Sequence, residues 1–272
     1  MVPNPPDSHQ RARGRLTQTL RHRDGTTGLE TLYQQGCLKA RFPRPVGWHE
    51  TVLLNTAGGV AGGDRLAIDI GAGPGTRATV TTQAAERFYR AIPGSMAYVT
   101  TALTVAGDAA LEWLPQETIL FDRCALDRTL TIDLVPGARF LGIEQLVFGR
   151  SAMGETVQVA EIRDRIVVRQ DGRLLLHDAT RLVGPVQAML DRPACAAGAR
   201  AVATIVHAGP DAAAMLDPLR AALGRYDAGA SVVDGLLIAR IVAANGACLR
   251  AASVAGLAVL RGGRPLPRVW EC

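Results

Sequence analysis

Short segments in which polar and apolar residues alternate occupy most of the chain up to about residue 208, and turn-forming residues separate them. In the segment 129–134, TLTIDL, every second residue is apolar, which is typical of a half-buried β-strand. Turn signals such as Pro136-Gly137 and Asp171-Gly172 recur at intervals of about 8 to 15 residues. The pattern predicts a mainly β fold, with strands near residues 29–40, 50–55, 65–70, 76–82, 97–105, 129–134, 139–148, 157–159, 166–168, 173–178 and 201–206. Alternation alone does not distinguish a sandwich from a β-helix.

Helical signals are confined to the C-terminal third. Residues 210–224 have Asp211 near the start, alanine and leucine in the middle and Gly224 at the end, the usual order of signals in a helix. A second helix is expected over residues 245–260. Residues 1–14 are rich in proline, arginine and polar residues and are predicted to form a mobile arm. Because no repeat or long linker divides the remainder, residues 15–272 are expected to form a single domain.

Lysine is nearly absent, since Lys39 is the only lysine among the 30 basic residues. A P-loop needs a lysine directly after a glycine, which argues against P-loop nucleotide hydrolysis. Schiff-base chemistry would depend on the same single residue. The five cysteines include no CxxC pair, so a structural zinc site is not expected. With no secretory signal visible and no apolar run of 18 residues, we expect free thiols, a cytoplasmic location and no membrane span.

The densest glycine cluster comprises Gly58, Gly59, Gly62 and Gly63, and Asp64 follows it. Successive backbone N–H groups can bind a phosphate. The spacing is not GxGxxG, however, and the residues after Asp64 alternate like a strand. We therefore favour two tight turns that need positive φ over a nucleotide site. Such a loop also lets another backbone approach closely, so a protein contact stays open.

Three acidic residues lie in or beside apolar stretches: Asp64, Glu144 and Asp178. An isolated carboxylate in apolar surroundings is costly, so such residues are usually paired with arginine or in contact with water. The alternative is that they line a channel or cavity that carries a cation. No spacing typical of Ser/His/Asp or Cys/His catalysis is visible, so the residues alone indicate no active site.

Five blocks carry a resemblance to a known family. In chain order they are residues 56–66 (TAGGVAGGDRL), 81–90 (TTQAAERFYR), 111–122 (LEWLPQETILFD), 138–150 (ARFLGIEQLVFGR) with Gly154-Glu155, and 264–270 (RPLPRVW). Together they resemble the urease accessory protein UreD family, called UreH in some organisms, over about residues 30 to 270. Five blocks in the same order are more specific than any one of them.

The resemblance implies a β-helix-like stack of strands with two C-terminal helices. It implies no catalytic reaction but a chaperone role in nickel insertion. A member of this family docks on the urease apoprotein, binds UreF and, through UreF, recruits the GTPase UreG, which brings nickel. The resemblance further implies that Ni²⁺ passes through the interior of the protein, with no tightly bound cofactor.

Nickel transit would give the acidic residues a role. Scattered carboxylate and water ligands suit a cation in transit better than a tight cage of cysteine and histidine does. By the matching blocks, Asp64, Glu144 and Asp178 are candidate nickel ligands, with Glu50 as a fourth. Many relatives carry aspartate at the position of Glu144.

Two other functions fit parts of the composition. The formal net charge of +5 would suit a basic β-rich nucleic-acid-binding module, although aromatic residues make up only 4% of the chain and leave few stacking platforms. A β-helical carbohydrate-active enzyme would need paired carboxylates on one strand face in successive coils, and no such ladder is visible. Neither alternative explains the five ordered blocks, so we expect neither nucleic acid nor a membrane as a partner.

Overall fold

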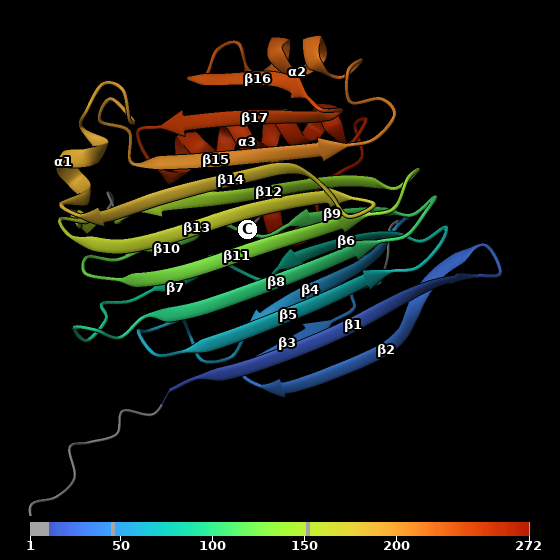
Figure 1. Cartoon of the computed structure of the whole chain (residues 1–272), viewed down its shortest axis with the longest axis horizontal. Helices are drawn as coiled ribbons and strands as arrows, with labels where there is room; N and C mark the ends of the chain where they lie inside the picture. Colours follow the sequence, from blue (N-terminus) through green and yellow to red (C-terminus); the bar gives the residue numbers. More distant parts are fainter. Residues whose placement is uncertain (1–10, 45–46, 151–152, 272) are drawn as a thin grey trace, which may run out of the picture.

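Two facing β-sheets make up the body of the protein in the computed structural model, which describes residues 11–44, 47–150 and 153–271 (Figure 1). Sheet A runs in the order β14 (Arg173–Gly184), β13 (Ala160–Gln170), β11 (Ala125–Leu134), β8 (Ala97–Val105), β5 (Arg65–Ala72), β1 (Arg13–Arg23) and β2 (Thr26–Gly36). Sheet B runs in the order β16 (Ala228–Val233), β17 (Leu236–Ala243), β15 (Ala201–Ala208), β12 (Arg139–Phe148), β9 (Ala110–Leu114), β6 (Arg77–Thr82), β4 (His49–Asn55) and β3 (Leu38–Arg41). The short strand β10 (Thr118–Leu120) pairs with β12 and with β7 (Glu86–Phe88).

The chain alternates between the two sheets and winds into stacked coils. In sheet A, β5, β8, β11 and β13 are parallel neighbours, and in sheet B, β4, β6, β9 and β12 are. Register partners on these strands in adjacent coils are 29 to 36 positions apart, as in the pairs Ala97–Leu126 and Arg128–Asp164. The predicted β-helix-like stack is therefore confirmed. Because coil length varies, the stack leaves no fixed repeat in the sequence.

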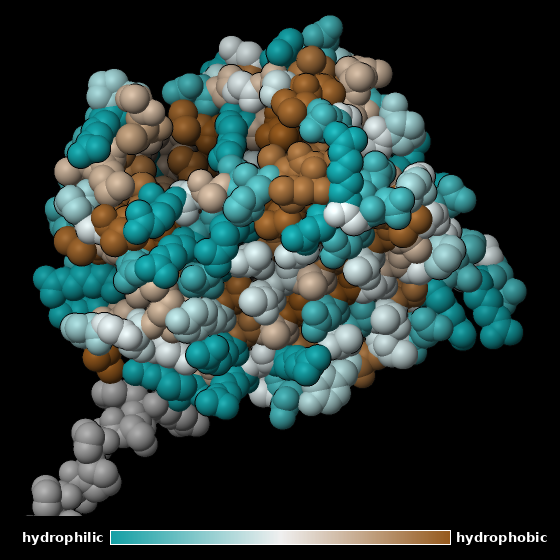
Figure 2. Space-filling view, viewed as in Figure 1, coloured by the Kyte–Doolittle hydropathy of each residue, from teal (hydrophilic) through white to brown (hydrophobic). Residues whose placement is uncertain are grey.

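Side chains alternate across each strand and fill two separate cores. Ala78 and Val80 of β6 face the interior between the sheets, whereas the neighbouring Thr79 and Thr81 face the helices. Since both faces of sheet B are covered, strands such as β9 are buried throughout. The outer face of sheet A lies open in Figure 2, where hydrophilic and neutral colours predominate over β1, β5 and β8.

Two helices and a 3₁₀ turn cover the outer face of sheet B: α2 (Leu216–Leu223), α3 (Gly246–Leu260) and η2 (Arg268–Trp270). The short helix α1 (Val186–Leu190) packs against β14 of sheet A, and its buried residues join the core between the sheets. The side chain of Asn245 accepts a hydrogen bond from the Cys248 amide at 2.9 Å and caps the start of α3. A Cβ at Gly256 would lie 3.2 Å from Ile205, so this glycine lets α3 pack closely on β15.

Both helices expected from the sequence are present as α2 and α3, while α1 was not expected. The strand predictions missed β1, β16 and β17 and the short strands β7, β9 and β10. Of the predicted arm, residues 1–10 lie outside the described residues, and Arg13 and Gly14 already belong to β1. Within the described ranges, no helix has the length and apolar character required to cross a membrane.

Candidate functional site

A cavity of about 270 Å³ runs between the sheets, from the loops after β4 and β6 to Glu144 of β12. Gly58, Gln83 and Arg87 line its outer end and are exposed to solvent. The walls between the ends are largely apolar and come from both sheets: Leu38, Leu53, Leu66, Ile68 and Val99. The cavity therefore joins the surface to charged groups in the interior.

Three charged side chains from successive strands meet at the inner end of this cavity. Nη1 of Arg128, on β11, lies 2.7 Å from Oε2 of Glu144, on β12. Nε and Nη2 of Arg128 donate to the two carboxylate oxygens of Asp164, on β13, at 2.8 and 2.7 Å. Trp113 Nε1 donates to Glu144 Oε1 at 2.8 Å, and Thr118 Oγ1 accepts from Arg128 at 2.9 Å. We call Arg128, Glu144 and Asp164 the interior ion cluster.

The cluster contains two carboxylates and one guanidinium, all three nearly buried. Burial raises the pKa of Glu144 above its usual value; the Arg128 charge opposes this shift and the Asp164 charge adds to it. Burial opposes the charge on Arg128, but Asp164 and Glu144 outweigh it and raise the pKa of the guanidinium. With the carboxylates ionised, the cluster carries one uncompensated negative charge and attracts a further cation.

A second, smaller cavity of about 20 Å³ lies on the other side of Glu144. Its lining includes Glu144, Asp164 and Asp178, and Asp178 forms an ion pair with Arg240 of β17. This volume is about that of one water molecule. The structure thus brings two predicted ligands, Glu144 and Asp178, to one cavity and adds Asp164 to them.

Asp64 lies elsewhere and binds backbone. Its two carboxylate oxygens accept hydrogen bonds from the amides of Ala12 and Ala61, both at 2.8 Å. The side chain is buried, but it is not among the described residues that line the cavity between the sheets. Asp64 therefore holds the start of β1 against the glycine loop.

The glycine loop contacts the chain's own backbone. Gly58, Gly59 and Gly63 have positive φ values of 76°, 140° and 94°. Gly62 does not, but a Cβ there would lie 2.4 Å from the carbonyl oxygen of Ser95. Tight turns and a close backbone approach together account for the four glycines.

Glu50 faces away from the cavity. It pairs in register with Thr79, whose side chain points to the helix-covered face of sheet B. Burial raises the pKa of Glu50, and the positive charge of Arg261 opposes this shift. Sheet B separates Glu50 from the interior ion cluster.

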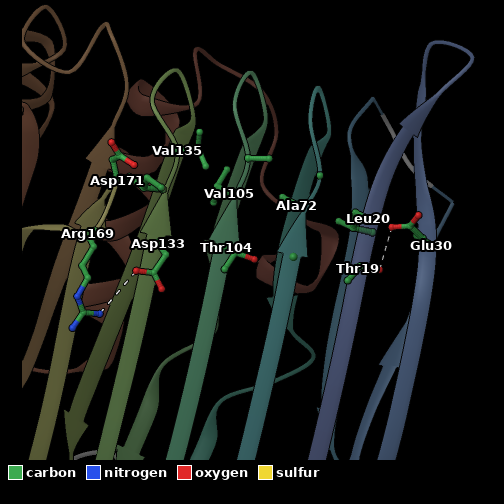
Figure 3. Close-up of a pocket in the computed structure, with 15 residues that line it drawn as sticks. Thr19, Leu20, Glu30, Ala72, Thr104, Val105, Asp133, Val135, Arg169 and Asp171 are labelled. Atoms are coloured by element: carbon green, nitrogen blue, oxygen red, sulfur yellow. Dashed lines mark hydrogen bonds and ion pairs between the residues drawn. The ribbon is translucent and has the colours of Figure 1, made fainter.

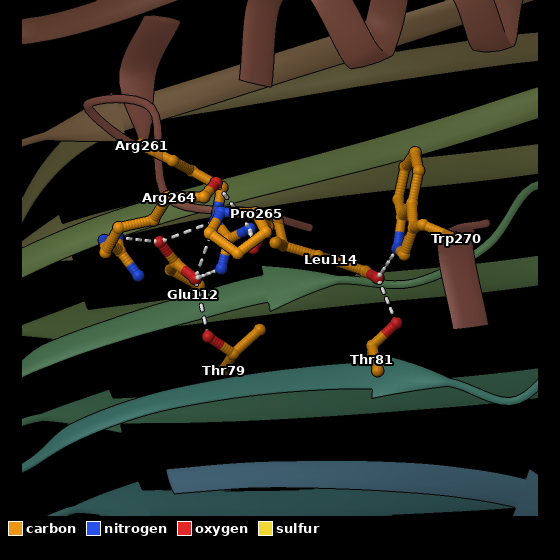
Figure 4. A network of polar contacts seen from close by, with 8 residues as sticks. All are labelled: Thr79, Thr81, Glu112, Leu114, Arg261, Arg264, Pro265 and Trp270. Carbon is orange, nitrogen blue, oxygen red and sulfur yellow. Dashed lines mark hydrogen bonds and ion pairs between the residues drawn. The ribbon is translucent and has the colours of Figure 1, made fainter. Parts of the chain in front are cut away.

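The same face of sheet B carries a polar network that joins it to the C-terminal segment (Figure 4). Glu112 accepts from Thr79 Oγ1 at 2.6 Å and from Nη2 of Arg261 at 3.0 Å, and it also pairs with Arg264. Trp270 Nε1 donates to the carbonyl oxygen of Leu114 at 3.0 Å. The last of the five sequence blocks is thus attached to the middle of the stack.

Sequence reasoning missed Arg128 and Asp164, although a signal was present. Asp164 falls between Ile162 and Ile166 in the inward-facing phase of its strand, and Arg128 occupies the same phase of β11. A charged residue in the buried phase of an alternating strand requires a partner or a ligand.

Glu86 was missed as well. It lines the cavity between the sheets and accepts a hydrogen bond from Asn55 Nδ2 at 3.1 Å. Burial raises the pKa of Glu86, while the hydrogen bond from Asn55 opposes the shift. A carboxyl group is therefore present near the outer end of the cavity as well as at its inner end.

A larger hollow of about 570 Å³ crosses the outer face of sheet A, where Figure 3 shows Thr19, Thr104, Asp133 and Arg169 from neighbouring strands. Two of its carboxylates have partners: Glu30 accepts from Thr19, and Asp133 lies 3.9 Å from Arg169. It contains none of the predicted ligands. In the described part of the chain, no three His, Cys, Asp or Glu side chains converge closely enough to hold a metal ion.

Comparison with known proteins identifies the family. The model of the UreD urease accessory protein family matches residues 12–271. A UreD from Rhizobium leguminosarum bv. viciae is 44% identical over 263 residues, or 96% of each chain. A UreD from a Methylobacterium strain is 49% identical over 256 residues, covering 91% of this chain and 90% of the relative. The match spans the sheets, the interior ion cluster and the C-terminal segment, and the chain therefore belongs to the UreD urease accessory protein family.

Proposed function

We propose that this chain is a non-catalytic maturation factor that helps deliver Ni²⁺ to urease through its interior. In this proposal it docks on the urease apoprotein, binds UreF and reaches UreG through UreF. The observation that supports interior transit most strongly is that Glu144 lines both cavities. A cation that enters beside Glu86 would meet Glu144 next and then Asp178.

The charges of the interior suit a cation in transit. With both carboxylates ionised, the interior ion cluster would have one negative charge in excess, which would favour a cation over an anion. Carboxylate oxygens are moderate ligands for nickel, and water would complete its coordination, so binding at each step is reversible. A cage of thiolates and imidazoles would release nickel far more slowly.

An apolar surface beside the outer end of the cavity suits docking of a protein partner. Tyr89 and Ile92 are exposed there, with 36% and 45% of their surface accessible. Tyr89 packs against Phe121 with ring centroids 4.9 Å apart, and the Arg150 guanidinium lies 4.6 Å from the centre of the Phe121 ring. Aromatic and arginine side chains are typical of protein interfaces. We place UreF on this surface, where it would pass the cation into the cavity.

The arginine content supports this proposal over a nucleic-acid module. Many arginines are engaged by carboxylates of the same chain: Arg128, Arg139, Arg150, Arg163, Arg165, Arg200, Arg240, Arg261 and Arg264. Paired guanidinium groups contribute little to the sequence-independent attraction of a phosphate backbone.

The test is nickel-dependent activation of urease co-expressed with UreF, UreG and this chain. Glu144→Gln and Asp178→Asn should lower activation, because each removes a charged ligand from the path. Glu50→Gln is the matched control, since Glu50 lies on the other face of sheet B and its loss should leave activation unchanged. Binding to UreF is measured in parallel to show that the variants fold. Full activation by both variants would refute interior transit, and failure of the wild-type chain to bind UreF or urease would refute the docking role.

A further inference from the structure

The guanidinium of Arg128 lies where the two cavities approach each other. Arg128 lines the larger cavity, Asp164 lines the smaller one, and Glu144 lines both. The contacts of the guanidinium with these carboxylates are 2.7 to 2.8 Å long. A cation that moves from one cavity to the other past Glu144 would therefore meet this group.

Arg128 binds the two carboxylates unequally. It holds Asp164 with two parallel hydrogen bonds but reaches Glu144 with Nη1 alone, and the same Nη1 also donates to Thr118. A two-point contact is the stronger and more oriented of the two. The guanidinium therefore stays with Asp164 when its contact with Glu144 is exchanged for another cation.

Without a resident positive charge, the same two carboxylates would be a strong site for a divalent cation. Glu144 and Asp164 are both nearly buried, and oxygen ligands of like charge that share one site are stabilised by a divalent ion. A cation held at such a site would not move on. The positive charge of Arg128 weakens that site and leaves Glu144 as its accessible ligand.

We infer that Arg128 is a positioning residue for transit: it acts through Glu144 and Asp164 as their resident counter-cation and prevents them from trapping Ni²⁺. This inference rests on the proposed function, since it assumes that nickel reaches the cluster. In this inference, Ni²⁺ is released from the carboxylates and not stored there because Arg128 weakens its binding.

The experiment measures the nickel retained by the chain in its complex with UreF. The complex is incubated with nickel chloride and desalted, and the bound metal is quantified by mass spectrometry. Arg128→Met should retain about one additional nickel ion per chain and should lower urease activation. Arg128→Lys keeps the charge but loses the two-point contact with Asp164, so it should retain more nickel than wild type and less than Arg128→Met.

A triple variant, Arg128→Met with Glu144→Gln and Asp164→Asn, is the matched control. It is expected to fold, because it removes all three charges and leaves none of them buried without a partner, which is the costly case. It should retain no additional nickel. A purely structural role for Arg128 would lower the stability of Arg128→Met without adding bound nickel.

Three results would overturn the inference: a folded Arg128→Met variant with wild-type nickel content, additional nickel that persists in the triple variant, or additional nickel without any loss of activation. If Arg128→Met does not fold, the neutral variant Arg128→Gln decides the question, since wild-type retention in a variant that has lost the positive charge also overturns the inference. Urease activation by the wild-type chain is measured separately. Its absence would refute the proposed function, whereas the nickel content of the variants tests the role of Arg128.

Discussion

Replacing Glu112 by glutamine tests whether the C-terminal segment stabilises the coil stack. Only 2% of Glu112 and 6% of Arg261 are exposed, and Arg261 Nε lies 3.2 Å from both carboxylate oxygens. Glutamine keeps the size and the hydrogen bond to Thr79 but leaves Arg261 buried without its counter-charge. Breaking one side of a buried ion pair costs about 3–5 kcal/mol. Against a total stability of about 5–15 kcal/mol, this loss is large.

Equilibrium unfolding in urea, followed by tryptophan fluorescence, measures this loss. Trp270 lies in the segment concerned, so its fluorescence contributes to the change when this segment is released. The same loss corresponds to a fall in melting temperature of about 6 to 20 °C.

Two control variants separate the buried charge from general damage. Arg264, with 35% of its side chain exposed, also pairs with Glu112, and Arg264→Ala should cost about 1 kcal/mol or less. The double variant Glu112→Gln with Arg261→Met removes both buried charges and should recover much of the stability. If Glu112→Gln costs no more than Arg264→Ala, the reasoning about the buried charge is wrong.

Three further predictions concern single side chains. Asp64→Ala leaves the amides of Ala12 and Ala61 without an acceptor, so it should cost about 1–3 kcal/mol and speed hydrogen exchange at both; unchanged exchange would contradict the anchoring role. Burial lowers the pKa of His207 from 6.5, so the unfolded chain binds the proton first and stability should fall as the pH drops below about 6.5. His207→Asn should reduce the dependence of the unfolding free energy on pH below about pH 6.5. An unchanged slope in the variant would show that His207 does not cause this dependence. Asn245→Ala removes the cap of α3 and should cost about 0.5–2 kcal/mol in urea unfolding, whereas Asn245→Ser should cost little.

Strands with a clean pattern could be predicted from the sequence, and strands with an unusual environment could not. The expected bounds 97–105 and 139–148 coincide with β8 and β12. By contrast, β17 (LLIARIVA) is apolar except for Arg240, because residues on both of its faces are buried, and it shows little alternation. The sequence of β1 likewise gave little signal, because it is mostly polar. Its buried residues are Gly14, Leu16, Gln18 and Leu20, and two of these four are not hydrophobic.

The candidate site was predictable only in part for a related reason. Glu144 stands out because it interrupts an apolar segment, but its partners lie on other coils. Asp164 is 36 residues from Arg128, and no local pattern indicates that their strands are neighbours in register. The role of Asp64 could not be predicted from the sequence either, because its hydrogen bond with the Ala12 amide depends on the position of β1 in the fold. Register between coils, and not residue type, was the missing information.

The long sequence separation between contacting residues also determines which parts of the fold can form first during synthesis. Glu112 is in the middle of the stack, yet its partner Arg261 follows it by 149 residues. At synthesis rates of about 5–20 residues per second, that interval lasts about 7 to 30 seconds. During this time α3 does not yet exist, and the helix-facing side of β9 and β12 is exposed on the nascent chain. We therefore expect this apolar surface to be most in need of a chaperone during translation, before the polypeptide is released.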